Sequence, residues 1–242
     1  SQEFLVHVND ALSQESVEYP PSSSSFPMQE RLDCLMYATT AHAPTTPRDI
    51  AYAVNQLCKC MHQPTPALMR EVDHVLSYLS RTASMGLTYT REHAKLVGFA
   101  DASWETRTST SGWVITWRSA AISWGSRKQK SIALSVDVEA EIIALSEAAK
   151  DVIYLRKLEK GLGDPEVRPT PLSTDSKSAR DVSYNPEHHN KMKHVERQHF
   201  CIRDMVESFE IEVPYVPTDQ NPADFFTKVA YEERVAVPRA PQ

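Results

Sequence analysis

The sequence has no apolar run that approaches the roughly 18 residues of a membrane-spanning helix. Its N-terminus, SQEFLVHVND, also lacks a basic segment followed by an apolar one, which is the pattern of a secretory signal peptide. We therefore expect a protein that stays inside the cell. Because the chain begins at Ser1 without an initiator Met, we also expect it to be a fragment or a processed product.

Only four cysteines occur in 242 residues, which favours reduced thiols over a disulfide framework. Cys58, Cys60 and His62 are the one metal-like cluster, but structural zinc usually has four ligands at CxxC-like spacing, so three helical residues are the simpler interpretation. Four further histidines lie close together in the sequence: His188, His189, His194 and His199. A spacing of five residues does not keep metal ligands on one face of a helix, so we favour hydrogen-bonding or packing roles for them.

The N-terminal third of the chain is expected to be a tail followed by a small helical module. Residues 1–27 end in YPPSSSSFP, which cannot bury enough apolar surface to become ordered. Residues 28–91 have a helical pattern, with one helix capped by Thr46 and Pro47 and a second one beginning after Thr65 and Pro66. The apolar faces of the two helices are formed by Ile50, Val54, Leu57 and Met61, and by Leu68, Val72, Val75, Leu76 and Leu79.

Residues 92–230 have the pattern of an α/β domain, and residues 231–242 are a second tail. Three short β-like runs, KLVGFADASW, SGWVITW and AAISWGS, predict an antiparallel meander. A long helix over 138–162, a strand at 171–174, a helix over 192–209, the strand IEVPYV and a short helix opened by Asn221-Pro222 follow. The order βββαβαβα predicts a mixed sheet flanked by helices.

Four acidic residues stand at positions where a carboxylate can do chemistry. Asp101 lies near the end of an apolar run that predicts a buried strand, where an ionised group needs a cation or several donors. Asp175 follows a predicted strand, and Asp224 follows the expected cap Asn221 by three residues. Asp175 and Asp224 each have a simpler structural role as an alternative to metal binding. Asp175 suits a helix N-cap, and Asp224 suits the first turn of a helix.

Glu141 and Glu139 can be separated by helical phase. Glu141 is in phase with Leu145, Ala148, Val152 and Leu155, which places it on the buried stripe of the long helix. Glu139 is in phase with Ser146, Glu147 and Lys150, and we interpret it as a solvated acid of the first turn. If one of the two binds a metal, the pattern favours Glu141.

Seven ordered blocks across about 140 residues resemble the ribonuclease H segments of copia-type retrotransposon polyproteins. They are GFADASW, RTSTSGW, ISWGSRKQ, ALSVDVEAEIIALSEAAKD, STDSKSA, KHVERQHFCIRD and YVPTDQNPADFFTK. The stretch between LDCLMYATT and GLTYT is similar to the end of the same family's reverse transcriptase, although the polymerase motif Tyr-x-Asp-Asp is absent. The resemblance implies a ribonuclease H-like mixed five-stranded sheet flanked by helices and preceded by a small helical module.

The resemblance also implies a site and an activity. The four metal-binding acids of the family match Asp101, Glu141, Asp175 and Asp224, which would hold two Mg²⁺ ions, or Mn²⁺, and cut the RNA strand of RNA–DNA hybrids. Cellular ribonucleases H often have a mobile His near the last Asp, and YVPTDQNPAD has none. The implied location is the cytoplasm, virus-like particles or the nucleus, and the implied protein partner is the remainder of the reverse transcriptase.

The net charge of −6 means that a nucleic acid must be bound by local basic clusters, against the field of the whole protein. A solvated surface is the alternative role for each candidate phosphate contact: Arg127, Lys128, Lys130, Lys191, Lys193, Arg197 and Arg203. Two other functions remain open. One is a decayed or domesticated relic that binds nucleic acid or a partner protein, and the other is an integrase-like nuclease, which the early position of Glu141 disfavours.

Overall fold

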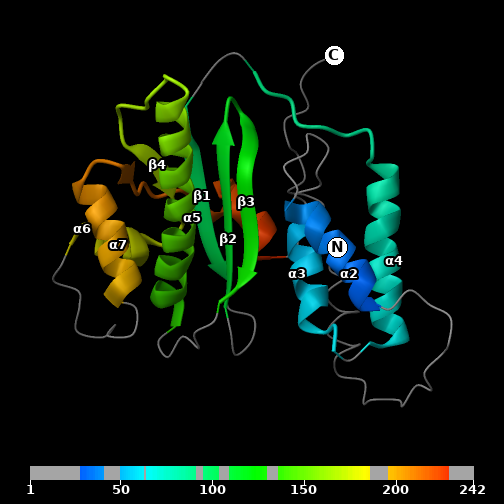
Figure 1. The fold of residues 1–242 in the computed structure, drawn as a ribbon. Helices are drawn as coiled ribbons and strands as arrows, with labels where there is room; N and C mark the ends of the chain where they lie inside the picture. The colour runs from blue at the N-terminus through cyan, green and yellow to red at the C-terminus, as the bar shows by residue number, and fades with distance from the viewer. Residues whose placement is uncertain are drawn as a thin grey trace. The chain divides into compact units, whose positions relative to one another are not determined.

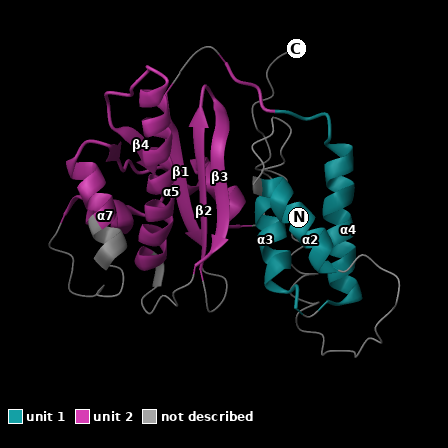
Figure 2. Ribbon diagram, viewed as in Figure 1, with its two compact units in different colours: residues 1–86, 229–242 teal, residues 87–228 magenta. Residues whose placement is uncertain are grey.

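The computed structural model describes residues 28–40, 50–62, 64–90, 95–103, 109–129, 136–185 and 196–228. They form two compact units that divide between Gly86 and Leu87 (Figures 1 and 2). None of the described helices is both long enough and apolar enough to cross a membrane.

The first unit consists of the helices α2 (Met28–Thr40), α3 (Ala51–Lys59) and α4 (Pro66–Arg81). As expected, Thr65 caps α4 by accepting a hydrogen bond from the Leu68 N–H at 3.2 Å, with Pro66 in the first turn. The predicted apolar faces are confirmed at Val54, Leu57, Leu68, Val72 and Val75, which are buried in one shared core. The predicted cap of the first helix, Thr46 with Pro47, lies outside the described residues.

Leu76 was wrongly placed on the buried face of α4, since it is 39% exposed. Leu68, Val72 and Val75 repeat at spacings of four and three and share one stripe, whereas Leu76 lies one residue beyond Val75 and is rotated to the edge of that stripe.

The second unit contains a five-stranded sheet with the order β3-β2-β1-β4-β5. The first three strands, β1 (Val97–Ser103), β2 (Thr110–Trp117) and β3 (Ala120–Lys128), form the predicted antiparallel meander. Then β4 (Thr170–Ser173) pairs in parallel with β1, and β5 (Ile211–Glu212) pairs in parallel with β4. The predicted ribonuclease H-like mixed sheet flanked by helices is therefore confirmed.

The last strand is shorter than the predicted run IEVPYV. Beyond Glu212 the pairing continues only as an isolated bridge between Thr174 and Tyr215. Pro214 has no N–H to donate to a ladder, although its carbonyl oxygen accepts from the Thr174 N–H at 3.2 Å.

The helix α5 (Val136–Gly161) crosses the sheet and packs on β1 and β2, with α6 (Lys177–Tyr184) and α7 (Glu196–Glu207) beside it (Figure 1). The sequence predicted one helix between β4 and β5, and the structure has two. The helix α6 was missed because it has eight residues and few apolar ones, too few to show a helical period.

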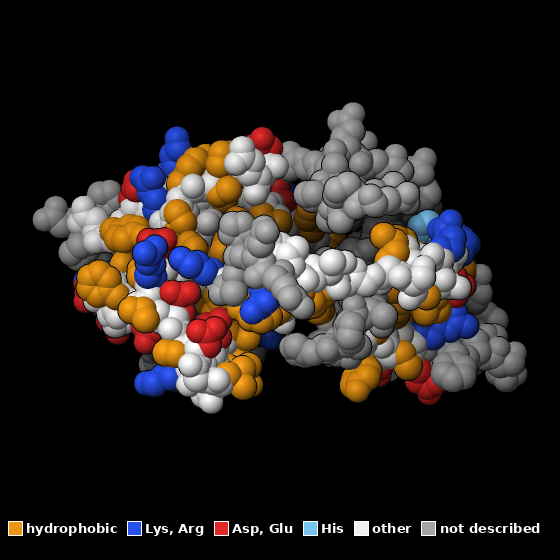
Figure 3. All heavy atoms as spheres, turned by 90° about the horizontal axis from the view of Figure 1, so that it is seen from above, with side chains coloured by type: hydrophobic (Ala, Val, Ile, Leu, Met, Phe, Trp, Pro, Cys, Tyr) orange, Lys and Arg blue, Asp and Glu red, His pale blue; other side chains and the backbone are white. Residues whose placement is uncertain are grey.

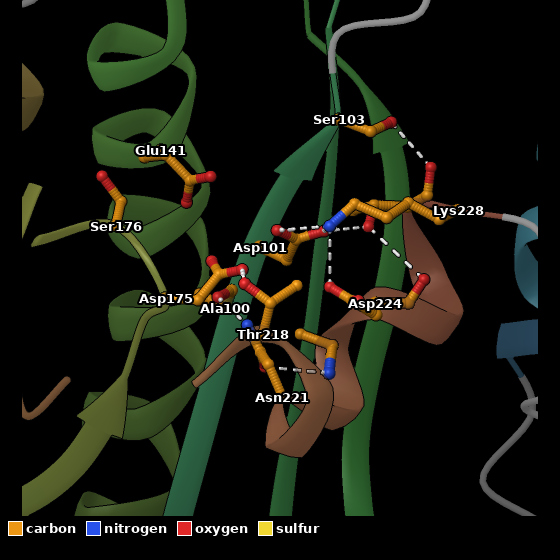
Figure 4. A network of polar contacts seen from close by, with 12 residues as sticks. Ala100, Asp101, Ser103, Glu141, Asp175, Ser176, Thr218, Asn221, Asp224 and Lys228 are labelled. Atoms are coloured by element: carbon orange, nitrogen blue, oxygen red, sulfur yellow. Dashed lines mark hydrogen bonds and ion pairs between the residues drawn. The ribbon is translucent and has the colours of Figure 1, made fainter. Parts of the chain in front are cut away.

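Acidic and basic side chains are mixed on the surface at the end where α5 finishes, which Figure 3 shows from above. Among the described residues seen in this view, the side chains form no continuous patch of one charge. The acidic residues singled out in the sequence lie toward the opposite end of the sheet, near the start of α5 (Figures 1 and 4).

Candidate metal centre

Two of the four predicted acids are brought together by the parallel pairing of β1 and β4. Asp101 lies within β1 and is 1% exposed, and Asp175 follows β4 by two residues. Parallel strands point their carboxyl ends toward the same edge of a sheet, which is where ligands bind in open α/β sheets. The side chains of Asp101 and Asp175 therefore meet at this edge (Figure 4).

The third acid, Asp224, is brought to the same edge by the short 3-10 helix η4 (Pro222–Phe226). Asn221, which is buried, holds this helix against the sheet: its Nδ2 donates to the Ala100 carbonyl oxygen in β1 at 3.1 Å, and its Oδ1 accepts from the Ala223 N–H at 3.1 Å. Asn221 is thus both the predicted cap of η4 and the residue that ties η4 to β1.

Gly112 in β2 leaves the space in which η4 lies. A Cβ added to Gly112 would stand 2.5 Å from Thr227 Cγ2, 2.8 Å from Phe226 Cβ and 3.1 Å from the Ala223 carbonyl oxygen. Gly112 also lies opposite Asp101 in the β1–β2 register. Any side chain larger than hydrogen at this position would push η4, and Asp224 with it, away from Asp101.

We expect Gly112→Ala to lower the free energy of unfolding by about 1–3 kcal/mol, the usual cost of overpacking a filled site. Binding of a metal ion should weaken as well, because Asp224 moves with η4. Thermal melts and a metal titration measure the two effects. Gly161→Ala is the matched control, since an added Cβ there meets nothing within 4 Å, and an equal effect of both substitutions would contradict this account.

Asp101, Asp175 and Asp224 can each offer an oxygen such that the three atoms lie within 4.8 Å of one another. Asp101 and Asp224 are buried, Asp175 is half-buried, and the Thr218 hydroxyl donates to Asp175 Oδ2 at 2.7 Å. Three converging carboxylates with no sulfur or nitrogen ligand among them are the donor set of hard divalent cations. The chemistry of these residues fits a metal ion.

Burial and mutual repulsion both act on the ionisation of these acids. The pKa of Asp101 is raised from 3.8 to about 6: burial is the largest cause, Lys228 and the Thr227 hydroxyl oppose it, and the charges of Asp224 and Asp175 add to it. Burial, followed by the charges of Asp101 and Asp175, raises the pKa of Glu141 well above its usual value. Without a cation, the site therefore opposes its own full ionisation.

Glu141 adjoins the three aspartates from the first part of α5 (Figure 4). It is 7% exposed, as its helical phase predicts, and lies 3.5 Å from the Thr174 hydroxyl, with a hydrogen bond from the backbone of Ala102. It does not belong to the group of oxygens within 4.8 Å. The structure thus places it at the border of the site.

The prediction that Glu139 is solvated is wrong, since its exposure is 5%. Ser146, which shares its phase, is also buried. The helix α5 as a whole packs on the sheet and also against α6 and α7, so burial along it is not confined to one stripe. Helical phase alone therefore overestimates the difference between the two glutamates.

We still expect substitutions of the two glutamates to differ in their effect on the activity of the protein. Glu141→Gln should lose most of the metal-dependent activity, because Glu141 interacts with Asp101 and Asp175, whereas Glu139→Gln should keep most of it. Both changes conserve size, so melts of the variants report whether the fold is intact. If Glu139→Gln is as inactive as Glu141→Gln while both remain folded, the assignment is wrong.

The alternative roles of Asp175 and Asp224 as helix caps can be compared with the structure. The N-cap of α6 is Ser176, whose hydroxyl accepts from the Ala179 N–H at 3.2 Å, so Asp175 is not a cap. The N-cap of η4 is Asn221, and the carboxylate of Asp224 lies 2.9 Å from Lys228 Nζ. Both aspartates direct their carboxylates to the site.

Sequence reasoning missed Thr227 and Lys228. The Thr227 hydroxyl donates to Asp101, and the Thr227 carbonyl oxygen accepts from the Ser103 hydroxyl at 2.6 Å. Lys228 lies four residues after Asp224, a spacing that favours ion pairs on a helical turn. That spacing was the signal that could have drawn attention to Lys228.

The predicted phosphate contacts are only partly described. The Arg127 side chain is 65% exposed and lies 3.9 Å from Glu147, with its guanidinium 5.5 Å from the ring centroid of Trp113, and Lys128 is exposed. Arg203 pairs with Glu207 at 3.2 Å, which favours a structural role for it. Lys130, Lys191 and Lys193, and the side chains of Arg197 and of the four histidines, lie outside the described residues.

The chain is similar to one segment of several transposon polyproteins. It is 33% identical over 218 residues to the retrovirus-related Pol polyprotein from transposon TNT 1-94 of Nicotiana tabacum, and 31% identical over 185 residues to that from transposon RE1 of Arabidopsis thaliana. These matches cover 88% and 74% of this chain but only 16% and 13% of the relatives. No family model matches the sequence.

A shorter relative and a solved structure are also similar. The chain is 37% identical over 134 residues to secreted RxLR effector protein 161 of Plasmopara viticola, a match that covers 53% of this chain and 91% of that protein. Its structure is similar to the N-terminal RNase H domain of a Mycobacterium tuberculosis protein, with a TM-score of 0.42, 18% identity, and coverage of 55% of this chain and 91% of that one.

Proposed function

We propose that this chain, which is similar to a segment of the retrovirus-related Pol polyproteins of transposons, hydrolyses the RNA strand of RNA–DNA hybrids by two-metal-ion catalysis. The observation that carries this proposal is the convergence of Asp101, Asp175 and Asp224 at the edge of the sheet, with Glu141 beside them. Hydrolysis of a phosphodiester needs an activated water, charge neutralisation at phosphorus and stabilisation of the departing 3′-oxygen.

The four acids would hold the metal ions, with Mg²⁺ as the natural ion and Mn²⁺ as a substitute. Two bound ions supply the activated water and neutralise the developing charge. Asp101, central and buried, would be one of the metal ligands, and the Thr227 hydroxyl orients its carboxylate. Thr218 orients Asp175 in the same way. The chain's own contribution is to hold these oxygens in place before metal and substrate arrive.

Substrate binding would depend on backbone and 2′-hydroxyl contacts along the minor groove of the hybrid, so sequence preference should be weak. Arg127 and Lys128, on the last strand of the meander, are candidates for phosphate contacts among the residues that the structure describes.

We further propose that residues 28–91 are the end of a reverse transcriptase and residues 92–230 its ribonuclease H domain. The remainder of that polymerase would be the protein partner, inside the cell.

A second candidate function is a non-catalytic one. The short relative from Plasmopara viticola carries a name unconnected with a polymerase, although this chain covers 91% of it. A related segment of about this size could therefore act by binding nucleic acid or a partner protein, without hydrolysis.

The experiment that separates the two candidates uses the purified chain, an end-labelled RNA–DNA hybrid, and Mg²⁺ or a chelator. We expect cleavage of the RNA strand with Mg²⁺ only, and no cleavage of duplex DNA. Binding of the hybrid without cleavage, in Mg²⁺ and in Mn²⁺, would favour the second candidate. Failure both to bind and to cleave would contradict the proposed function.

A further inference from the structure

Lys228 reaches into the acidic site from the turn that follows η4 (Figure 4). Its Nζ lies 2.9 Å from Asp224 Oδ1, and 3.5 and 3.4 Å from the two carboxylate oxygens of Asp101. The Lys228 side chain is 39% exposed, whereas those of Asp101 and Asp224 are 2% and 10% exposed. One ammonium group thus bridges two buried carboxylates and still has access to water.

The backbone fixes where this ammonium group begins. The Lys228 N–H donates to the Asp224 carbonyl oxygen at 2.9 Å. The preceding residue, Thr227, is fully buried and is held by two hydrogen bonds. Its side-chain hydroxyl donates to Asp101, and its backbone carbonyl oxygen accepts from the Ser103 hydroxyl. The ion pair is therefore built on an anchored segment, unlike a pair between two flexible surface side chains.

Two adjacent buried carboxylates are unfavourable unless a positive charge lies between them. Removal of one partner from a buried charge pair leaves the other uncompensated and destabilises the fold. In the arrangement described, Lys228 compensates both Asp101 and Asp224.

We propose that Lys228 is a positioning residue that acts as an internal counter-ion: it holds Asp224 against Asp101 before metal binds, and it competes with the metal for the same oxygens. The inference rests on the proposed function, in which these carboxylates are metal ligands. Because its side chain is partly exposed, the Lys228 ammonium can withdraw into water when a metal ion takes its place.

The test compares the wild-type chain with Lys228→Met, Lys228→Arg and the control Lys150→Met, an exposed lysine of α5. Each protein is melted in chelator and at increasing Mg²⁺, and the Mg²⁺ concentration at half-maximal stabilisation is recorded. Lys228→Met should melt at a lower temperature in chelator and reach half-maximal stabilisation at about fivefold less Mg²⁺, which corresponds to about 1 kcal/mol of removed competition. Lys228→Arg and Lys150→Met should resemble the wild type.

A role confined to structure would lower the melting temperature of Lys228→Met without changing the Mg²⁺ midpoint, and that result would overturn the inference. Equal melts of Lys228→Met and wild type in chelator would also overturn it. If Lys228→Met does not fold, Lys228→Gln is compared by the same two criteria. A wild-type chain that takes up no Mg²⁺ contradicts the proposed function, and the counter-ion role then depends on the chelator melts alone.

Discussion

Asp101→Asn is expected to reduce cleavage of an RNA–DNA hybrid by about a thousandfold or more. The change replaces one carboxylate oxygen by an amide NH₂, which cannot ligate a cation. Asp101 is the most buried of the three aspartates and contacts Thr227 and Lys228. Steady-state cleavage rates at saturating Mg²⁺ measure the loss.

Asp204→Asn is the matched control for this substitution, because Asp204 is exposed on α7 and lies outside the acidic group. It should cleave at the wild-type rate. Asp101→Asn should also remain folded, since the amide conserves the shape of the side chain. A folded Asp101→Asn protein that cleaves within tenfold of the wild-type rate would exclude Asp101 from the reaction.

Metal-free stability should fall as the pH rises through the range from about 4 to about 6. The pKa of Asp101 is 3.8 in a solvated chain and about 6 in the fold, so over this range the folded state binds more protons than the unfolded state. The free energy of unfolding then decreases with pH, by on the order of 3 kcal/mol for a shift of about two units. Glu141, whose pKa is also raised, adds to the decrease.

Mg²⁺ should reverse this loss at neutral pH. A ligand at a hundred times its dissociation constant stabilises the fold by about 2.7 kcal/mol. Asp101→Asn should melt at the same or a higher temperature than the wild type in chelator and should lose most of the gain from Mg²⁺. Melts of both proteins at pH 4.5 and 7, with Mg²⁺ and with chelator, measure these effects.

Asp224→Ala separates a metal ligand from an ordinary helix-turn acid. If Asp224 only stabilised the first turn of η4, its loss would cost about 1 kcal/mol with or without Mg²⁺, and the response to metal would survive. A wild-type melt that is the same in Mg²⁺ and in chelator at pH 7 would count against the whole site.

The sequence was sufficient to place the strand-end aspartates and the long helix, because strand runs and helical phase are local signals. Asp101 and Asp175 were correctly assigned to the ends of strands that turned out to be parallel neighbours. The burial of Glu139 could not be predicted, since it depends on which elements cover α5. Neither could the contact of Lys228 with Asp101, which joins residues 127 positions apart.

The attachment of η4 to β1 gives the site a place in the order of folding. The β-meander forms from neighbouring hairpins, but the bond from Asn221 to Ala100 spans 121 positions and must await closure of that long loop. During synthesis the strands β1 to β3 can pair before the segment from Asn221 to Lys228 has been made. A nascent chain would therefore form its meander before its acidic centre, because Asp224 and Lys228 are made long after Asp101.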